Sequence, residues 1–265
     1  MSMLHVTGNS LPGTTPAGHH RCMRELRSAT DVGNATDDLL VRWAAQALVA
    51  GYPHPGGAAW QHRSAVAVHA PKLSRNDRVV FSGSADDCAE LLAEVLPTLR
   101  GEKLRPLART ALAHRVANRL GLEVRATFGW MELSAAPPTA PTPNAGWLDD
   151  DQAVESLLRK ANPRAYLFPD DPGARRWAGI RGTDGTVLSV GGDCWAAPGV
   201  RFISGVATHP DHRGAGLAAE VCAFLTRELA REGDVALMVD ADNEPALKVY
   251  RRLGYRYHSV SALAG

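Results

Sequence analysis

Several features that would assign a function class directly are missing from this sequence. The 265 residues carry 29 basic and 28 acidic side chains, and a formal net charge of +1 indicates neither a nucleic-acid nor a membrane-surface partner. No apolar run approaches the roughly 20 residues of a transmembrane helix. The first ten residues, MSMLHVTGNS, lack the basic and apolar regions of a signal peptide. We therefore expect a cytoplasmic protein that binds neither nucleic acid nor membrane.

Cysteine is scarce, and its spacing lacks any CxxC pair. The four cysteines are scattered along the chain at Cys22, Cys88, Cys194 and Cys222. A secreted disulfide framework is not expected from this pattern, and reduced thiols in a cytosol fit it better. The run His19-His20-Arg21-Cys22 contains metal-binding residue types without a complete ligand set. We predict no metal site.

A proline-rich stretch divides the chain into two units. LSAAPPTAPTPNAG, residues 133–146, contains four prolines, which favour a stiff, extended spacer. We predict a linker over residues 134–146, between an N-terminal α/β domain (residues 21–133) and a C-terminal domain (residues 147–265). Residues 1–20, rich in Gly, Pro, Thr and His, are expected to be poorly ordered.

The N-terminal domain mixes helix and strand patterns. Apolar residues at helical spacing predict helices in DDLLVRWAAQALV, ADDCAELLAEVLPTL and LARTALAHRVANRLG, the last ending at Gly121. Short strand patterns occur in RVVF (Arg78–Phe81) and in EVRATFGWMEL.

The C-terminal domain opens with a predicted helix in DDDQAVESLLRKAN, whose aspartates suit the positive end of a helix. Two strands, RRWAGIRG and TVLSVGG, follow around the hairpin signal Asp184-Gly185. A strand over Val200–Thr208, a helix stopped by Gly233 and the buried strand pattern VALMVD come next. The last predicted elements are a helix that Asn243 caps and Gly254 ends, and a strand from Tyr255.

The segment THPDHRGAGLAAEV (Thr208–Val221) has the features of a phosphate-binding loop. Arg213, Gly214, Gly216 and Ala218 lie between a strand and a helix start. The first N–H groups of a helix have no helical partner, and the helix dipole adds positive potential there. An ATP P-loop and a dinucleotide-binding GxGxxG loop both fail to match. The alternative interpretation is a tight turn that merely requires small residues.

Two motifs, in this order, resemble the GCN5-related N-acetyltransferase (GNAT) family. Arg213-x-x-Gly216-x-Ala218 is similar to the family's acyl-CoA pyrophosphate loop. DNEPALKVYRRLGY is similar to its closing segment, in which an asparagine caps a helix, a tyrosine follows seven residues later, and the helix ends in Gly-Tyr. The matching residues here are Asn243, Tyr250, Gly254 and Tyr255. The resemblance covers roughly Asp149 to the C-terminus and implies a mixed, mostly antiparallel sheet flanked by helices.

The resemblance implies acetyl-CoA as co-substrate. The implied cofactor-binding residues are the strand residues Val206 and Thr208, the helix cap Asn243, and the loop residues Arg213, Gly214, Ala215, Gly216, Leu217 and Ala218. It also implies that Tyr250 is the general acid that protonates the CoA thiolate. An unperturbed tyrosine, with a pKa of about 10, is protonated at neutral pH. The alternative for Tyr250 is a core residue near Leu247 and Leu253.

We expect an N-acyltransferase that moves acetyl from acetyl-CoA to a primary amine of a small molecule, by direct transfer in a ternary complex. A protein lysine as acceptor and a homodimer stay open.

The general base is unmarked: His209, Asp193, Asp240 and water relays are all candidates. Trp177 and Trp195 belong either to the core or to an acceptor pocket. The alternatives to an enzyme are a non-catalytic acyl-CoA-binding sensor or regulator and an interaction module with a vestigial loop.

The N-terminal domain resembles the family only in LAHRVANRLGLEVRATFGWMEL, which has the helix, glycine and strand of a closing segment. No Arg-x-x-Gly loop precedes it. We interpret this domain as a degenerate second copy without a cofactor site, which covers the acceptor site or mediates dimer contacts.

Overall fold

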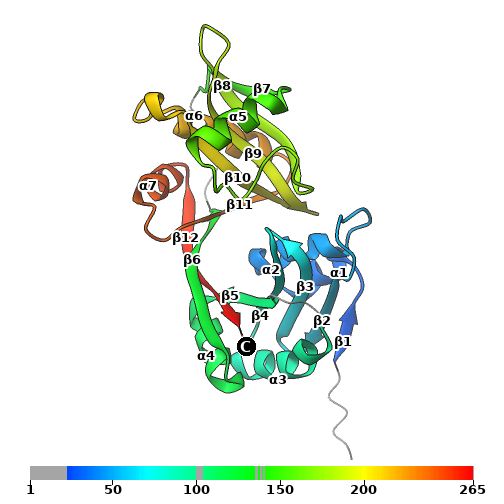
Figure 1. Cartoon of the computed structure of the whole chain (residues 1–265). Coiled ribbons are helices and arrows are strands. Elements are labelled where there is room, and N and C mark those ends of the chain that lie inside the picture. The colour runs from blue at the N-terminus through cyan, green and yellow to red at the C-terminus, as the bar shows by residue number, and fades with distance from the viewer. Residues whose placement is uncertain (1–22, 100–103, 135–136, 138, 140, 265) are drawn as a thin grey trace, which may run out of the picture.

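The computed structural model describes residues 23–99, 104–134, 137, 139 and 141–264 (Figure 1). The predictions for residues 1–20 and for the His19–Cys22 run therefore lie outside the described residues. Within the described ranges, no helix combines the length and the apolar character that a membrane span requires.

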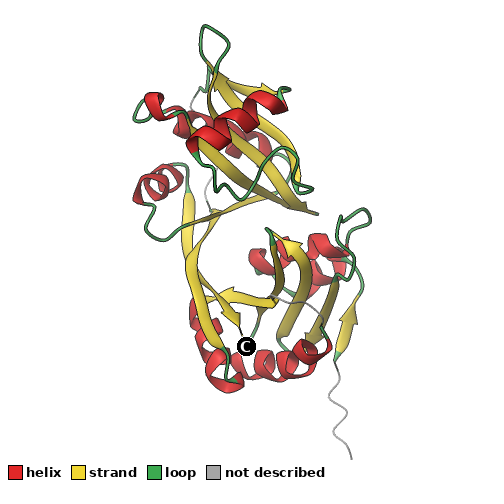
Figure 2. Ribbon diagram, in the orientation of Figure 1, coloured by secondary structure: helices red, strands yellow, loops and turns green. Residues whose placement is uncertain are grey.

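The described strands form one twelve-stranded sheet with helices on its faces (Figures 1 and 2). The strands are β1 (Arg24–Leu26), β2 (Ala58–His62), β3 (Ala65–Leu73), β4 (Asn76–Ser82), β5 (Leu104–Arg109), β6 (Glu123–Leu133), β7 (Ala145–Leu148), β8 (Ala174–Arg181), β9 (Val187–Ala197), β10 (Val200–Thr208), β11 (Asp234–Val239) and β12 (Tyr255–Ala264). The α-helices are α1 (Ala29–Ala35), α2 (Leu39–Ala44), α3 (Ala85–Val95), α4 (Thr110–Leu120), α5 (Asp151–Ala161), α6 (Leu217–Leu229) and α7 (Glu244–Arg252).

The strand order repeats one unit twice. It runs β1-β2-β3-β4-β5-β12-β6-β11-β10-β9-β8-β7. The succession β2-β3-β4-α3-β5-α4-β6 in the N-terminal half recurs as β8-β9-β10-α6-β11-α7-β12 in the C-terminal half. With these elements matched, the strand order is the same from either edge of the sheet. Only β4–β5 and β10–β11 pair in parallel among the described strands, so the predicted mixed, mostly antiparallel sheet is confirmed.

The last strands of the two units are exchanged. β6 ends the N-terminal unit but pairs with β11, and β12 ends the C-terminal unit but pairs with β5. The two strands also pair with each other over their full length, from Tyr255↔Leu133 to Ala264↔Glu123 (Figure 1). The sheet therefore runs without a break through both halves of the chain. β7 begins inside the stretch predicted as linker, because it pairs with β8 at the sheet edge.

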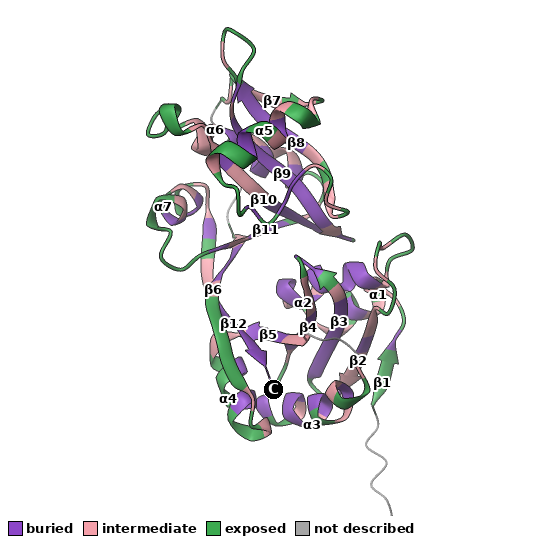
Figure 3. Cartoon of the chain, viewed as in Figure 1, coloured by how far each residue is buried: buried purple, intermediate pink, exposed green. Residues whose placement is uncertain are grey.

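Two apolar clusters cover opposite faces of the C-terminal half of the sheet. On one face, Phe202 of β10 stacks on Trp43 of α2 at a ring distance of 4.8 Å, within a cluster that also includes α5. On the other face, Ile203 packs with Val221 of α6 and Leu237 of β11. Successive residues of a strand point to opposite faces, so β10 is buried on both sides for most of its length (Figure 3).

Candidate functional site

The parallel strands β10 and β11 separate in the middle of the sheet. Their pairing runs from Val200↔Asp234 to Ile203↔Leu237 and stops there, although β10 continues to Thr208. Beyond this point β9 is the one described strand that pairs with β10, and that ladder has an irregularity between Ser204 and Ala207. The bulge and the lost pairing open the sheet between the two strands.

A cavity of about 260 Å³ occupies this opening. Its wall includes Ser204, Gly205 and Val206 of β10, Met238 and Val239 of β11, and Asp240, Asn243, Ala246 and Tyr250 beyond β11. Phe202 lines it from one face of the sheet, and Tyr250 belongs to the cluster on the opposite face. The cavity therefore passes between the strands from one face of the sheet to the other.

The predicted phosphate loop lies where β10 turns into α6. Gly214 and Gly216 have φ angles of +82° and +80°, in the left-handed region that favours glycine. A Cβ at either position would meet nothing within 4 Å, so conformation rather than crowding requires the two glycines. Gly216 caps α6 without any side-chain hydrogen bond.

The backbone of this loop presents donors for an anion. Within the described part of the chain, the N–H groups of Gly214, Leu217 and Ala218 have no hydrogen-bond acceptor. Such groups at the positive end of a helix bind phosphate. The side chain of Arg213 instead donates to the carbonyl of Ala161 at the end of α5, at 3.0 Å, and so anchors the loop.

Each predicted site residue has a definite place around this opening. Val206, Asn243 and Tyr250 share the cavity wall. Thr208 ends β10, and the loop residues follow it outside the cavity: Arg213, Gly214, Ala215, Gly216, Leu217 and Ala218. Asn243 caps α7, as its Oδ1 accepts from the Ala246 N–H at 3.2 Å, so the cap prediction is confirmed.

Tyr250 is a core residue and is also part of the cavity wall. The residue is 7% exposed and packs with Leu247 in the core, and it also lines the cavity. Burial and the neighbouring Cys222 thiol raise the pKa of Tyr250 well above its usual value. The phenol therefore keeps its proton at neutral pH and can act as a donor.

The candidate bases differ in their surroundings. Asp193 is fully buried and forms ion pairs with Arg201 at 2.5 Å and Arg176 at 3.0 Å, which is a structural arrangement. His209 contacts the Nζ of Lys160 at 2.8 Å, outside the cavity. Asp240 is the one of the three that lines the cavity, among the residues described.

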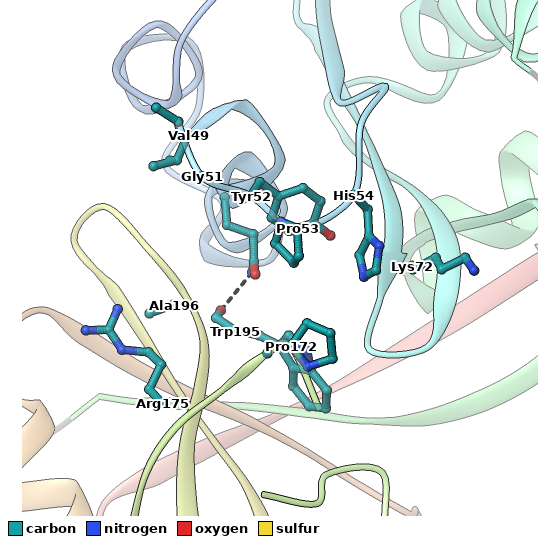
Figure 4. A pocket seen from close by; sticks show the side chains of 13 residues that line it. Val49, Gly51, Tyr52, Pro53, His54, Lys72, Pro172, Arg175, Trp195 and Ala196 are labelled. Atoms are coloured by element: carbon teal, nitrogen blue, oxygen red, sulfur yellow. Dashed lines mark hydrogen bonds between the residues drawn. The ribbon is translucent and has the colours of Figure 1, made fainter. Parts of the chain in front are cut away.

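The two tryptophans also differ. Trp177 belongs to the core, 2% exposed. Trp195 lines the cavity, and its φ of +40° is a left-handed conformation at irregular strand pairing. The Gln46 amide of the N-terminal half donates to the Trp195 carbonyl at 2.7 Å. Figure 4 shows an adjoining pocket where Trp195 and Pro172 lie opposite residues of the N-terminal half.

Sequence reasoning missed the lining residues that come from outside the C-terminal segment. Ser74 and Arg78, on or next to β3 and β4, and Phe128 of β6 line the cavity, together with Tyr166. Ser74, Arg78 and Phe128 reach the cavity only through the pairing of the two halves, so no local motif marks them.

The turn between β4 and α3, which occupies the corresponding place in the N-terminal unit, differs from the β10–α6 loop. Two residues, Gly83 and Ser84, connect β4 to α3. The Ser84 hydroxyl accepts from the Asp87 N–H and so occupies the end of the helix. Asp86 and Asp87 in the first turn would repel an anion.

Comparisons with known proteins agree with this geometry. Residues 179–262 match the family model described as FR47-like protein. The chain has the GNAT fold. A GCN5-related N-acetyltransferase from Kribbella flavida is 20% identical, with a TM-score of 0.53 over 75% of this chain and 85% of that chain.

Two further solved structures are similar to almost the whole chain. A Drosophila protein is 16% identical, with a TM-score of 0.58 over 91% of this chain and 98% of that chain. A GNAT-family acetyltransferase from Colwellia psychrerythraea is 12% identical, with a TM-score of 0.52 over 92% and 99%. A comparison with curated proteins finds no match. The GNAT resemblance predicted from the loop and the closing segment is confirmed at the level of the fold.

Proposed function

We propose that this protein is an N-acyltransferase that transfers acetyl from acetyl-CoA to the primary amine of a small molecule. The observation that carries the proposal is the cavity that passes through the sheet between β10 and β11. A thioester that enters from one face of the sheet can meet, in this cavity, an amine that enters from the other face, as a ternary complex requires.

Acetyl-CoA would bind along the separated half of β10. None of the described strands pairs with the β11-facing side of β10 after Ile203, so the amides of pantetheine can pair with the backbone at Val206 and Thr208. The pyrophosphate would then reach the N–H groups of the loop from Arg213 to Ala218. Asn243 shares the cavity wall with Val206 and holds the start of α7 in place.

The chemistry would proceed by direct attack. The neutral amine forms a bond to the thioester carbon, the carbon–sulfur bond breaks, and the thiolate accepts the proton of the Tyr250 phenol. The surplus proton of the amine passes to Asp240, directly or through water. The Tyr250 phenol is protonated at neutral pH, and after CoA leaves, the proton taken up by Asp240 restores it, directly or through water.

Replacing Tyr250 by Phe tests this assignment. We expect kcat to fall at least about 100-fold, as for the loss of a general acid, while the Kd for acetyl-CoA stays the same. Tyr255→Phe is a matched control, since Tyr255 is also a buried tyrosine, bonds Thr226 at 2.9 Å and does not line the cavity. The assay follows release of the CoA thiol with a panel of primary amines.

Two results would contradict the proposal in different ways. Equal kcat values for Tyr250→Phe and wild type would remove Tyr250 as the acid. Acetyl-CoA binding by the wild type without turnover of any amine would favour a non-catalytic acyl-CoA sensor.

A further inference from the structure

Arg78 is a buried cation that pairs with none of the described carboxylates. It lies on β4 of the N-terminal unit, is 6% exposed, and lines the cavity between β10 and β11. Its Nε has no hydrogen-bond acceptor, and no carboxylate in the described part of the chain forms an ion pair with its guanidinium. The equally buried Arg201, by contrast, contacts Asp193 and Glu232.

A buried charge without a counter-charge is energetically unfavourable, so the burial of Arg78 requires an explanation. Burial lowers the pKa of Arg78 to about 10, so the guanidinium is still charged at neutral pH. Its neighbours do not balance the charge. Arg105, its register partner on β5, has the same sign, and the nearby aromatic groups are the Phe128 ring at 5.9 Å and the Tyr166 phenol. No anion among the described residues balances Arg78, which leaves its place open to an anion from solution.

Arg78 lies at the end of the cavity away from Tyr250 and the phosphate loop, where the acceptor amine of the proposed reaction would enter. Arg78 and Val80 alternate with Val79 along β4, so Arg78 shares the sheet face of the cluster that includes Val80 and Phe202. Tyr250 belongs to the cluster on the opposite face, where α6 and the phosphate loop lie. An anion on Arg78 thus faces the CoA site through the opening in the sheet.

The same hairpin brings a second polar group to this end. Ser74 and Arg75, in the β3–β4 turn, have φ angles of +49° and +63°, and Ser74 is 6% exposed in the cavity wall. Arg75 binds Asp171 of the C-terminal half at 2.8 Å, which fixes the turn across the two units. The strained turn therefore places Ser74 next to the opening, within reach of the same ligand.

We propose that the acceptor is a small amine that carries a carboxylate, as an amino acid does, and that Arg78 binds this carboxylate. The planar guanidinium matches a carboxylate with two parallel hydrogen bonds, and Ser74 offers a further hydroxyl donor. This inference rests on the proposed function. It gives the N-terminal unit, which has no anion site of its own at α3, the role of completing the acceptor site.

The test uses matched pairs of acceptors: amino acids and the corresponding amides, which keep the amine and lose the carboxylate. We expect wild-type kcat/KM to favour the acid over its amide by about 100-fold, as for a buried charged contact. Arg78→Gln should reduce this ratio to within about tenfold and leave the Kd for acetyl-CoA unchanged. Because the ratio is measured within one preparation, partial unfolding of a variant does not alter it.

Two further variants define the contact. Arg78→Lys keeps the charge without the planar fork, so we expect an intermediate ratio. Arg105→Gln removes the neighbouring cation, which does not line the cavity, and should leave the ratio as in the wild type.

The outcomes separate this inference from the proposed function. Loss of acetyl-CoA binding in calorimetry would remove the enzyme assignment and this inference with it. With acetyl-CoA bound, equal or better use of the amides, an unchanged ratio in Arg78→Gln, or no turnover of any carboxylate-bearing amine would overturn the acceptor class alone. A preference for succinyl-CoA with a neutral amine, abolished by Arg78→Gln, would move the carboxylate to the acyl group and also overturn it.

Discussion

Substituting Gly216 can separate two effects, the strain of a left-handed backbone conformation and the loss of anion binding. It caps α6 at a φ of +80°, and a Cβ there would meet nothing within 4 Å. Gly185, in the turn between β8 and β9, has a φ of +83° and the same open surroundings. Replacing either glycine by Ala therefore adds the same left-handed strain, but only Gly216 lies in the proposed pyrophosphate site.

The magnitudes follow from these conformations. A left-handed non-glycine residue costs about 1–2 kcal/mol, so each variant should lower Tm by about 2–8 °C. Gly216→Ala should also displace at least one charge-assisted hydrogen bond from the pyrophosphate, worth about 1.5–3 kcal/mol. That loss corresponds to a Kd for acetyl-CoA about 10- to 100-fold higher.

Thermal unfolding and calorimetric titration of both variants provide the assay. The expected pattern is two similar Tm shifts and weakened acetyl-CoA binding in Gly216→Ala alone. Equal Kd values for both variants and the wild type would refute the reasoning, because the glycines of the loop would then serve only the turn.

Two predictions concern stability. Asp193→Asn leaves the buried Arg201 with only Glu232, at 3.2 Å, and should lower the free energy of unfolding by about 3 kcal/mol in urea titrations; a loss below about 1 kcal/mol would contradict this. A hydrogen bond from Ser64 lowers the pKa of Asp87 to about 2 from 3.8. Because the folded pKa lies below the unfolded value, its stabilisation is present above pH 4 and lost as the pH falls through 2. The Tm gap between wild type and Asp87→Asn should therefore shrink between pH 5 and pH 2, and a constant gap would argue against it.

The elements of the C-terminal half could be predicted because their determinants are local. The strand Val200–Thr208 matches β10, and apolar periodicity located α6 and α7. The α7 helix ends just before its predicted stop at Gly254, whereas α6 ends at Leu229, ahead of Gly233. Asn243 caps α7 by its own side chain. These features need no knowledge of the partner strands.

Features that depend on distant partners were predicted only in part: β6 and β12 were expected as strands, but their pairing was not. β5 contains Pro106, which usually argues against a strand, yet it is held between β4 and β12. The exchange of β6 and β12 depends on pairing between segments more than 100 residues apart, and no local pattern encodes it. The helix predicted in DDLLVRWAAQALV is shorter than the apolar pattern indicates: α2 ends at Ala44, and a 3-10 turn follows.

The candidate site, like the fold, has one part that the sequence could predict and one part that it could not. The loop, Asn243 and Tyr250 come from one continuous segment, and the family resemblance that this segment carries singles them out. Ser74 and Arg78 lie more than 100 residues away from that segment, in a unit with no cofactor motif. The role proposed for them rests on burial and on the absence of a carboxylate partner for Arg78 among the described residues, which only the folded chain shows.

The central claim is that acetyl-CoA binds at the N-terminus of α6 and only there. Calorimetric titration of acetyl-CoA and CoA into the wild type and into Gly216→Glu tests it most directly. We expect one binding event per chain in the wild type and none in Gly216→Glu, whose added carboxylate repels the pyrophosphate. Absence of binding by folded wild type, two sites per chain, or unchanged binding by Gly216→Glu would contradict it.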